Sequence, residues 1–179
     1  MDKCDTCDFN YTDYEFDDIS KNINSLVSQY AKRLQAGIDD PDIEIALWSR
    51  PSPQIWSGLE YCCHIRDVFL IQRERLFTTL VESTPSFSPL YADQRAELGR
   101  YGAENIEQVG LEIKVSANLF SKILLEINDE QKSRTFIYDY PTTCERNITW
   151  LARHTLHEAY HHLRDLDLVT ELSLRPKRK

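Results

Sequence analysis

The five histidines of this 179-residue chain lie in two short segments, and their spacing is typical of metal ligands. Four of them are close together near the C-terminus, and the fifth, His64, lies far earlier in the chain. Residues four apart on an α-helix lie about 40° apart around its axis, so His157 and His161 can converge on one cation. His64 is the only histidine that a facing helix can add to them. The sequence therefore predicts a divalent-metal site formed by His64, His157 and His161.

Three more side chains near these histidines could take part in the chemistry. His154 lies on the same helix face as the predicted pair and could be a fourth ligand, a proton shuttle or a core histidine, the last being preferred. A fourth ligand would close the coordination position that catalysis needs. Asp67 and Asp165 each follow a predicted ligand by one helical turn, so they could orient an imidazole by accepting its second N–H.

The segment from His157 to His161 also spells H-E-x-x-H, the pattern in which zinc peptidases hold the metal with two histidines and activate water with the glutamate. Glu158 is therefore the predicted catalytic residue. A peptidase remains the least favoured reading, because no downstream histidine continues the extended pattern and Glu171 lies close to the end of the chain.

Four long stretches with helical periodicity must position these residues. They are predicted to span about residues 18–37, 56–82, 104–127 and 142–169. The connection between the second and third helices contains two prolines and two glycines around a short helix at 92–98, and it is longer than adjacent antiparallel helices need. The predicted fold is therefore all-α, a four-helix bundle with a long crossover between helices two and three.

Length and composition favour one soluble domain. We expect an acidic N-terminal extension with a C-x-x-C motif at 1–17, the bundle at 18–170 and a basic tail at 171–179. The formal net charge of −8 disfavours nucleic acid as a partner. No apolar run approaches the roughly 20 residues that a bilayer requires, and the N-terminus lacks the features of a signal peptide, so we expect a cytoplasmic protein without membrane contact.

The C-x-x-C motif of the extension, Cys4 and Cys7, resembles half of a zinc knuckle or a redox pair. No second C-x-x-C completes a four-thiolate site, and no strand and helix frame it as in thioredoxin-like proteins. A packed or merely reduced pair is therefore preferred over a metal site.

Two segments resemble the DinB/YfiT-like metalloenzymes: RPSPQIWSGLEYCCHIRDV at 50–68 and RHTLHEAYHHLRDLD at 153–167. The resemblance covers about residues 18–170. Members of that family are four-helix bundles with a long crossover, and they bind a divalent metal through one histidine of the second helix and an i,i+4 pair of the fourth. By position, the resemblance implies the ligands His64, His157 and His161.

The resemblance also implies an activity, because relatives include enzymes that join low-molecular-weight thiols to electrophilic substrates. We expect a metal-dependent thiol S-transferase, or related group transfer or hydrolysis, with a small-molecule substrate and a thiol as co-substrate. Zinc is the preferred metal, with nickel, iron or manganese as alternatives, since imidazoles suit several metals. The competing hypothesis is a non-catalytic metal-binding or partner-binding bundle, with a possible homodimer. A site closed by His154 would favour the binder, and an open position near Glu158 the enzyme.

Overall fold

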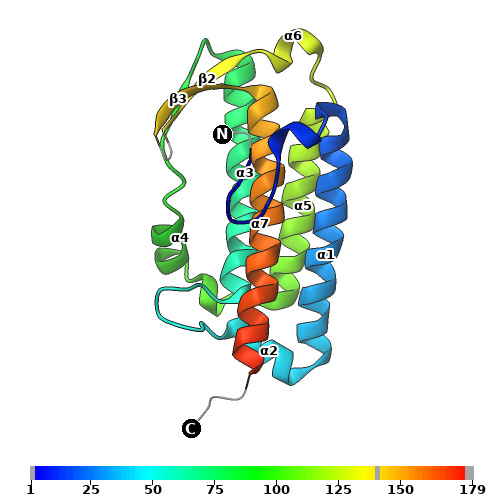
Figure 1. Cartoon of the computed structure of the whole chain (residues 1–179), viewed down its shortest axis with the longest axis vertical. Helices are drawn as coiled ribbons and strands as arrows, with labels where there is room; N and C mark the ends of the chain where they lie inside the picture. The colour runs from blue at the N-terminus through cyan, green and yellow to red at the C-terminus, as the bar shows by residue number, and fades with distance from the viewer. Residues whose placement is uncertain (1–2, 140–141, 176–179) are drawn as a thin grey trace.

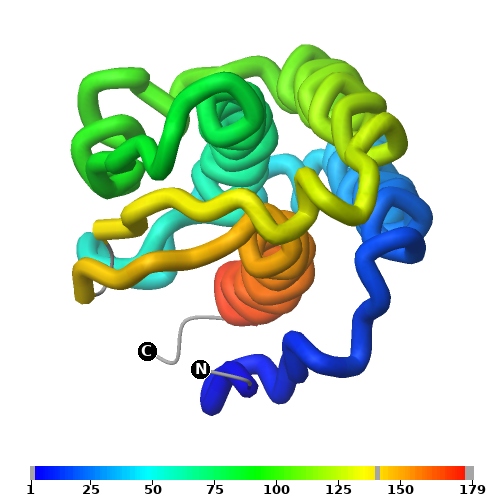
Figure 2. Tube along the Cα trace, turned by 90° about the horizontal axis from the view of Figure 1, so that it is seen from above, coloured from blue at the N-terminus to red at the C-terminus, as the bar shows by residue number. Residues whose placement is uncertain are grey.

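Four long helices packed side by side dominate the computed structural model, which describes residues 3–139 and 142–175 (Figure 1). They are α1 (Ile19–Asp39), α3 (Gly58–Val81), α5 (Ile106–Leu124) and α7 (Ile148–Leu174). Both α1 and α3 pack against α5 and α7, which places α1 and α3 at opposite corners of the bundle, as the end-on view shows (Figure 2). The predicted four-helix bundle is confirmed.

The long crossover between the second and third long helices is also confirmed. Helices α3 and α5 run in the same direction, so the chain has to return along the length of the bundle between them (Figure 1). The return contains a two-residue strand, the short helix that the sequence predicts, and a 3-10 turn: β1 (Ser86–Phe87), α4 (Ala92–Leu98) and Tyr101–Ala103.

A small three-stranded sheet closes the end of the bundle at which α7 begins (Figure 1). After the short helix α6 (Asp129–Lys132), β2 (Thr135–Asp139) pairs in parallel with β1 and antiparallel with β3 (Thr143–Asn147). The predicted start of the fourth helix at 142–143 is therefore wrong. The helix begins after Asn147, whose side-chain oxygen accepts the backbone N–H of Trp150 at 2.8 Å.

The first connection is more helical than the sequence indicates. Between the first two predicted long helices lies α2 (Pro41–Trp48), which Asp40 caps by accepting the backbone N–H of Asp42 at 2.9 Å. A proline is tolerated there because the first helical position needs no N–H donor. Helix α1 runs past Gly37 to Asp39, and Gly37 instead allows close packing, since an added Cβ would overlap the side chain of Leu47.

A capping box begins α3 and ties the preceding loop to it. The hydroxyl of Ser57 accepts the backbone N–H of Glu60 at 3.3 Å, and the Glu60 carboxylate accepts that of Ser57 at 2.8 Å. Arg50 donates to the same carboxylate through Nε at 2.7 Å. The loop is therefore held against the first turn of α3, with the ring of Trp56 centred 5.3 Å from that of His64.

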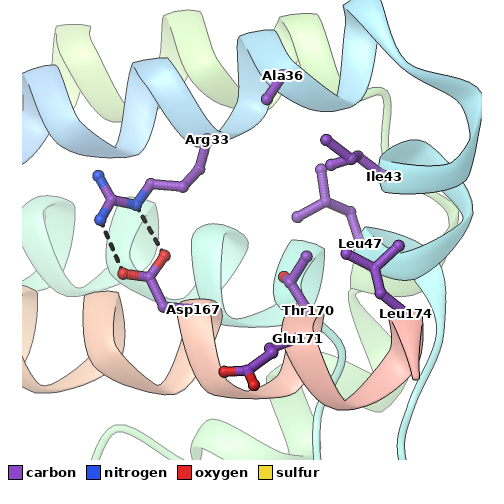
Figure 3. Close-up of a pocket in the computed structure, with 8 residues that line it drawn as sticks. All are labelled: Arg33, Ala36, Ile43, Leu47, Asp167, Thr170, Glu171 and Leu174. Atoms are coloured by element: carbon purple, nitrogen blue, oxygen red, sulfur yellow. Dashed lines mark hydrogen bonds and ion pairs between the residues drawn. The ribbon is translucent and has the colours of Figure 1, made fainter.

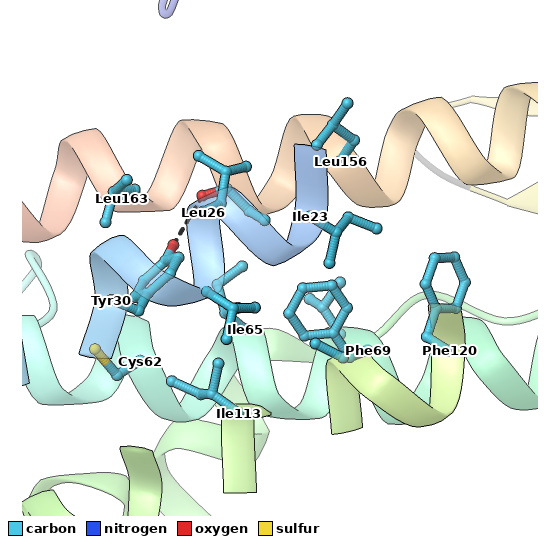
Figure 4. Packing of buried hydrophobic residues seen from close by; sticks show 14 of the residues in the cluster. Ile23, Leu26, Tyr30, Cys62, Ile65, Phe69, Ile113, Phe120, Leu156 and Leu163 are labelled. Carbon is cyan, nitrogen blue, oxygen red and sulfur yellow. Dashed lines mark hydrogen bonds between the residues drawn. The ribbon is translucent and has the colours of Figure 1, made fainter. Parts of the chain in front are cut away.

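The apolar core fixes the rotation of α7 about its own axis. Leu156 and Leu163 point into the bundle, and the carbonyl of Ala159 between them accepts a hydrogen bond from the buried Tyr30 hydroxyl at 2.9 Å (Figure 4). They pack among side chains from α1, α3 and α5, including Ile23, Leu26, Cys62, Ile65, Phe69, Ile113 and Phe120. This orientation decides which histidines of α7 face α3 and which face away.

The residues predicted as an N-terminal extension pack along α7 (Figures 1 and 2). Cys7, Phe9 and Tyr11 are buried, and Arg153 of α7 donates to the backbone carbonyl of Tyr14 at 2.8 Å. At the other end, the predicted basic tail overlaps the last turn of α7, and residues 176–179 lie outside the described part of the chain. Among the described residues, no helix combines the length and apolar character needed to cross a membrane.

Candidate metal centre

One cluster of donor atoms lies between the facing helices α3 and α7. We name it the His-Glu-His cluster; its members are His64, Glu158 and His162. Nε2 of His64 lies 3.8 Å from Oε2 of Glu158, and Nε2 of His162 lies 3.7 Å from the same oxygen. His64 is only 4% exposed. Glu158 and His162 are four residues apart on α7, so their side chains project from one face toward α3.

The surroundings orient the two imidazoles of this cluster. His162 shares a 2.8 Å hydrogen bond between its Nδ1 and Asp165, and with Nδ1 as the donor, Nε2 can act as a ligand atom. Trp56 and Tyr61, both half-buried, flank the rings of His64 and His162 at centroid distances of 5.3 Å. Aromatic side chains therefore border the cluster.

The electrostatics of the cluster favour a charged carboxylate. Burial disfavours the ionised form of Glu158, but the imidazoles of His157, His162 and His64 outweigh it and hold the pKa of Glu158 well below its ordinary value. Burial likewise opposes the charged form of His162, yet Asp165 and Glu158 raise its pKa to about 9. Burial lowers the pKa of His64. The same carboxylates that favour the protonated form of His162 would favour a metal cation bound in place of that proton.

The donor set fits a divalent transition metal. Two imidazoles and one carboxylate are the protein ligands of catalytic zinc in several hydrolases and of iron in facial-triad enzymes. Donors around such an ion lie about 3 to 3.5 Å apart when the bonds are near 2.0–2.2 Å. The 3.7 and 3.8 Å separations seen here need only a small contraction. The cluster is a candidate divalent-metal site.

His154 has other partners. Its Nδ1 lies 3.0 Å from the hydroxyl of Tyr11 and its Nε2 3.4 Å from that of Tyr138, and its ring stacks on Trp150 with centroids 4.5 Å apart. Burial lowers its pKa to about 4, so the ring is neutral at physiological pH. These contacts are those of a hydrogen-bonded core histidine, the reading preferred from the sequence. Its Nε2 also lies 3.8 Å from Oε1 of Glu158, farther than either tyrosine hydroxyl.

The structure does not place the other two predicted ligands beside His64. His157 and His161 lie on the side of α7 that faces the N-terminal segment, where they approach two thiols. The four ligand atoms of this second group lie within 4.8 Å of one another. We name it the Cys-His cluster; its members are Cys4, Cys7, His157 and His161. The predicted trio is thus divided between two clusters.

The two aspartates predicted to orient ligands differ in outcome. Asp165 bonds His162, as described, and its carboxylate also lies 3.5 Å from Nε2 of His161. Asp67 instead pairs with Arg66 at 2.9 Å and accepts the hydroxyl of Tyr101 at 2.5 Å. Nδ1 of the buried His64 has no hydrogen-bond partner among residues 3–139 and 142–175, so Asp67 does not orient that ring.

A separate apolar pocket lies at the far end of α7. Its walls come from α1, α2 and α7, and a two-bond ion pair between Arg33 and Asp167 joins α1 to α7 at one edge of it (Figure 3). Its nearest lining residue on α7, Asp167, lies about 7.5 Å along the helix axis beyond His162. Its lining holds no histidine or cysteine.

Fold and site together define a class: a four-helix bundle with a long crossover and a candidate divalent-metal site between facing helices. A solved structure of the same fold is that of YfiT from Bacillus subtilis, described as a probable metal-dependent hydrolase with an unusual four-helix bundle topology. The two chains superpose with a TM-score of 0.67 over 86% of each, at 16% sequence identity. No family model matches the chain, and no curated protein matches it. The YfiT-like fold expected from the sequence is confirmed.

Proposed function

We propose that this protein is a divalent-metal-dependent enzyme whose metal is held by the His-Glu-His cluster. The observation that carries the proposal is the convergence of His64 from α3 with the i,i+4 pair Glu158 and His162 from α7. Three protein ligands leave a coordination position for a reacting group, which is the arrangement of catalytic rather than structural zinc sites. We assign His154 to its two tyrosine partners rather than to the metal, and this assignment leaves that position open.

Each residue has a role in this proposal. A bound divalent ion supplies Lewis-acid polarisation and lowers the pKa of a nucleophile. Asp165 holds His162 in the ligating tautomer, and Glu158 supplies the negative charge that favours a cation. This gives Glu158 the role of a ligand, in place of the general base that the H-E-x-x-H spelling suggests. Trp56 and Tyr61 provide aromatic surface for a small organic substrate.

Hydrolysis of a small-molecule substrate is the reaction that the site supports best. Two histidines and a glutamate are the zinc ligands of thermolysin and carboxypeptidase A, in which water is the nucleophile. The description of YfiT as a probable metal-dependent hydrolase supports the same reaction class.

Thiol S-transfer is the second candidate, and the open position supports it too. A low-molecular-weight thiol would then replace water as the nucleophile and react with an electrophilic co-substrate. The cluster itself contributes no cysteine, so the thiol would have to come from outside the chain. Zinc is the metal we propose for either reaction, and the donor set also accommodates iron, nickel or manganese.

The test begins with metal analysis of untagged protein. We expect His64→Ala, Glu158→Gln and His162→Ala each to lose one equivalent of bound metal relative to the wild type, while Asp167→Asn on the same helix retains it. Activity would be screened on small esters and amides, and on thiols with a chromogenic electrophile. The proposal fails if all three variants keep the wild-type metal content, or if metal-loaded protein is no more active than stripped protein on every substrate tested.

A further inference from the structure

The N-terminal C-x-x-C motif forms a folded turn rather than a loose tail. The backbone N–H of Cys4 donates to the carbonyl of Phe9 at 2.8 Å, and that of Asp8 donates to the carbonyl of Cys4 at 3.2 Å. Asp8, directly after the second cysteine, has a φ of 59°, in the left-handed region that sharp turns use. Cys7 is buried and Cys4 half-buried, so the turn presents both thiols toward α7.

The turn meets an i,i+4 histidine pair. Sγ of Cys4 lies 3.8 Å from Nδ1 of His161. Thiolates and imidazoles around a tetrahedral zinc ion lie about 3.3 to 3.8 Å apart, given bonds near 2.3 Å to sulfur and 2.0–2.1 Å to nitrogen. The Cys-His cluster, with all four donors within 4.8 Å, is close to this arrangement.

His157 is an independent sign of a missing ligand. Neither of its ring nitrogens has a hydrogen-bond partner in the described part of the chain, although both are buried. The rings of Phe9 and Tyr11 lie against it at centroid distances of 5.3 Å, so water has little access to this side of the ring. A buried imidazole with two unpaired nitrogens costs free energy unless something bonds to it.

A carboxylate lies near one ring nitrogen of each histidine in the Cys-His cluster. Nδ1 of His157 lies 3.4 Å from Oε1 of Glu158, which leaves Nε2 for a metal. In His161 the positions are reversed, with Nε2 lying 3.5 Å from Asp165 and Nδ1 facing Cys4. These contacts are not hydrogen bonds as they stand, but a carboxylate near the second nitrogen of a ligating histidine is well placed to accept its N–H when a metal binds the first.

We propose that the Cys-His cluster binds one zinc ion in a closed, four-ligand site that fastens the N-terminal segment to α7. Two cysteines and two histidines are a standard structural zinc set, and four protein ligands leave no position for a substrate. Its four ligands differ from those of the His-Glu-His cluster, although Glu158 and Asp165 lie near histidines of both. Its task is also different, which is to hold residues 3–14 against the bundle. The proposal does not depend on the proposed enzymatic activity.

Cobalt spectroscopy on the untagged full-length chain tests the proposal. Protein stripped of metal under reducing conditions would be titrated with Co²⁺, which gives thiolate-to-cobalt charge-transfer absorption only when cysteine sulfur binds it. We expect this band to saturate at one equivalent per chain and to disappear when Zn²⁺ is added. Absence of the band at saturating Co²⁺ would overturn the proposal without any variant.

Variants then assign the band. Cys4→Ser and Cys7→Ser should each lose most of the charge-transfer intensity. Cys144→Ser, which changes a half-buried cysteine outside the cluster, should keep it, and so should His64→Ala, which removes a ligand of the other cluster. Retention of the band in both Cys4→Ser and Cys7→Ser, or its loss in Cys144→Ser, would refute the assignment.

A labelling experiment on the wild type guards against misfolded variants. Zinc should slow alkylation of Cys4 and Cys7 at least tenfold while the rate at Cys144 stays unchanged, as measured by mass spectrometry of the peptides. Equal rates with and without zinc at all three cysteines would contradict the site.

Discussion

The buried carboxylate of Glu60 offers a sharp test of how the loop before α3 is held. Glu60→Gln keeps the shape of the side chain and an oxygen for the backbone N–H of Ser57, but it removes the charge that Arg50 pairs with. The substitution therefore isolates the ion pair from the capping box.

The magnitude follows from the burial of the two partners. Breaking a fully buried ion pair costs about 3–5 kcal/mol. The Glu60 side chain is 6% exposed, but that of Arg50 is 34% exposed, so water can solvate the guanidinium once its partner is lost. We expect a loss of about 2 kcal/mol, between the buried and surface limits. For a chain of this length that corresponds to a fall of about 4–8 °C in Tm.

The pH dependence carries a second expectation. Burial alone would raise the pKa of Glu60, but Arg50 and the Ser57 backbone outweigh it and lower that pKa below its ordinary value. A lowered pKa contributes stability that is complete above the unfolded value, near pH 4.3, and is lost as pH falls through the folded value. The difference in unfolding free energy between wild type and variant should therefore be constant from pH 7 to about pH 5 and narrow below it.

Urea denaturation followed by circular dichroism measures both quantities. Glu171→Gln, which removes the exposed partner of Arg175, is the matched control and should change stability by less than about 0.5 kcal/mol. The reasoning is refuted if Glu60→Gln behaves like this control at pH 7, or if its effect grows rather than shrinks in acid.

Three further predictions concern the metal ligands and the packing of the helices. Asp165→Ala should weaken metal binding by about 10–100-fold in a competition titration, because it removes the acceptor beside His162 and the carboxylate near His161. Asp167→Ala should bind metal normally, and equal affinities in the two variants would contradict the role of Asp165. Stripping the metal with a chelator should lower the free energy of unfolding, and zinc at 100 times its Kd should restore about 2.7 kcal/mol per site; a zinc-independent Tm would argue against both clusters. Gly58→Ala should lower the free energy of unfolding by about 1–3 kcal/mol, because its Cβ would come within 2.8 and 2.9 Å of leucines on α7 and α2. Gly110→Ala, whose Cβ would lie 3.4 Å from its nearest neighbour inside a helix, should raise that free energy by about 0.5–1 kcal/mol. If denaturation shows that both variants change stability in the same direction, the close packing at Gly58 does not explain the effect.

The long helices could be predicted from the sequence because each buries a continuous apolar stripe. The sheet could not, because β3 reads Thr-Cys-Glu-Arg-Asn, with no alternation of apolar and polar residues. Its pairing with β2 is set by contacts between segments rather than by local preference. Helix α2 is hard to predict because Pro41 is as typical of a turn as of the first position of a helix.

The histidine site was only partly predictable for a geometric reason. The pairs His157–His161 and Glu158–His162 have the same i,i+4 spacing and differ by about 100° in direction. Which pair faces His64 depends on the rotation of α7, and that is fixed by Leu156, Leu163 and the other core contacts rather than by the pair itself. The H-E-x-x-H spelling drew attention to the pair that faces the other way.

The residues next to Cys4 and Cys7 do not indicate that these thiols meet α7. Cys4 and His161 are separated by 157 positions, and the motif by itself suggested a packed or reduced pair. The pattern on α7 does carry a signal. That helix has two i,i+4 donor pairs and the facing helix has one histidine, so the second pair needs partners from another segment. The C-x-x-C motif is the one cysteine pair in the sequence spaced to supply two soft donors from a single turn.

The docking of residues 3–18 on α7 has a consequence for how the protein is made. Residues 3–14 are synthesised long before α7, on which they dock, so Phe9 and Tyr11 stay uncovered until that helix has been made. Contacts of such large sequence separation form late and slowly, because most of the chain must be ordered before they can close. A chain that lacks α7 therefore leaves an apolar, thiol-bearing segment without its binding surface.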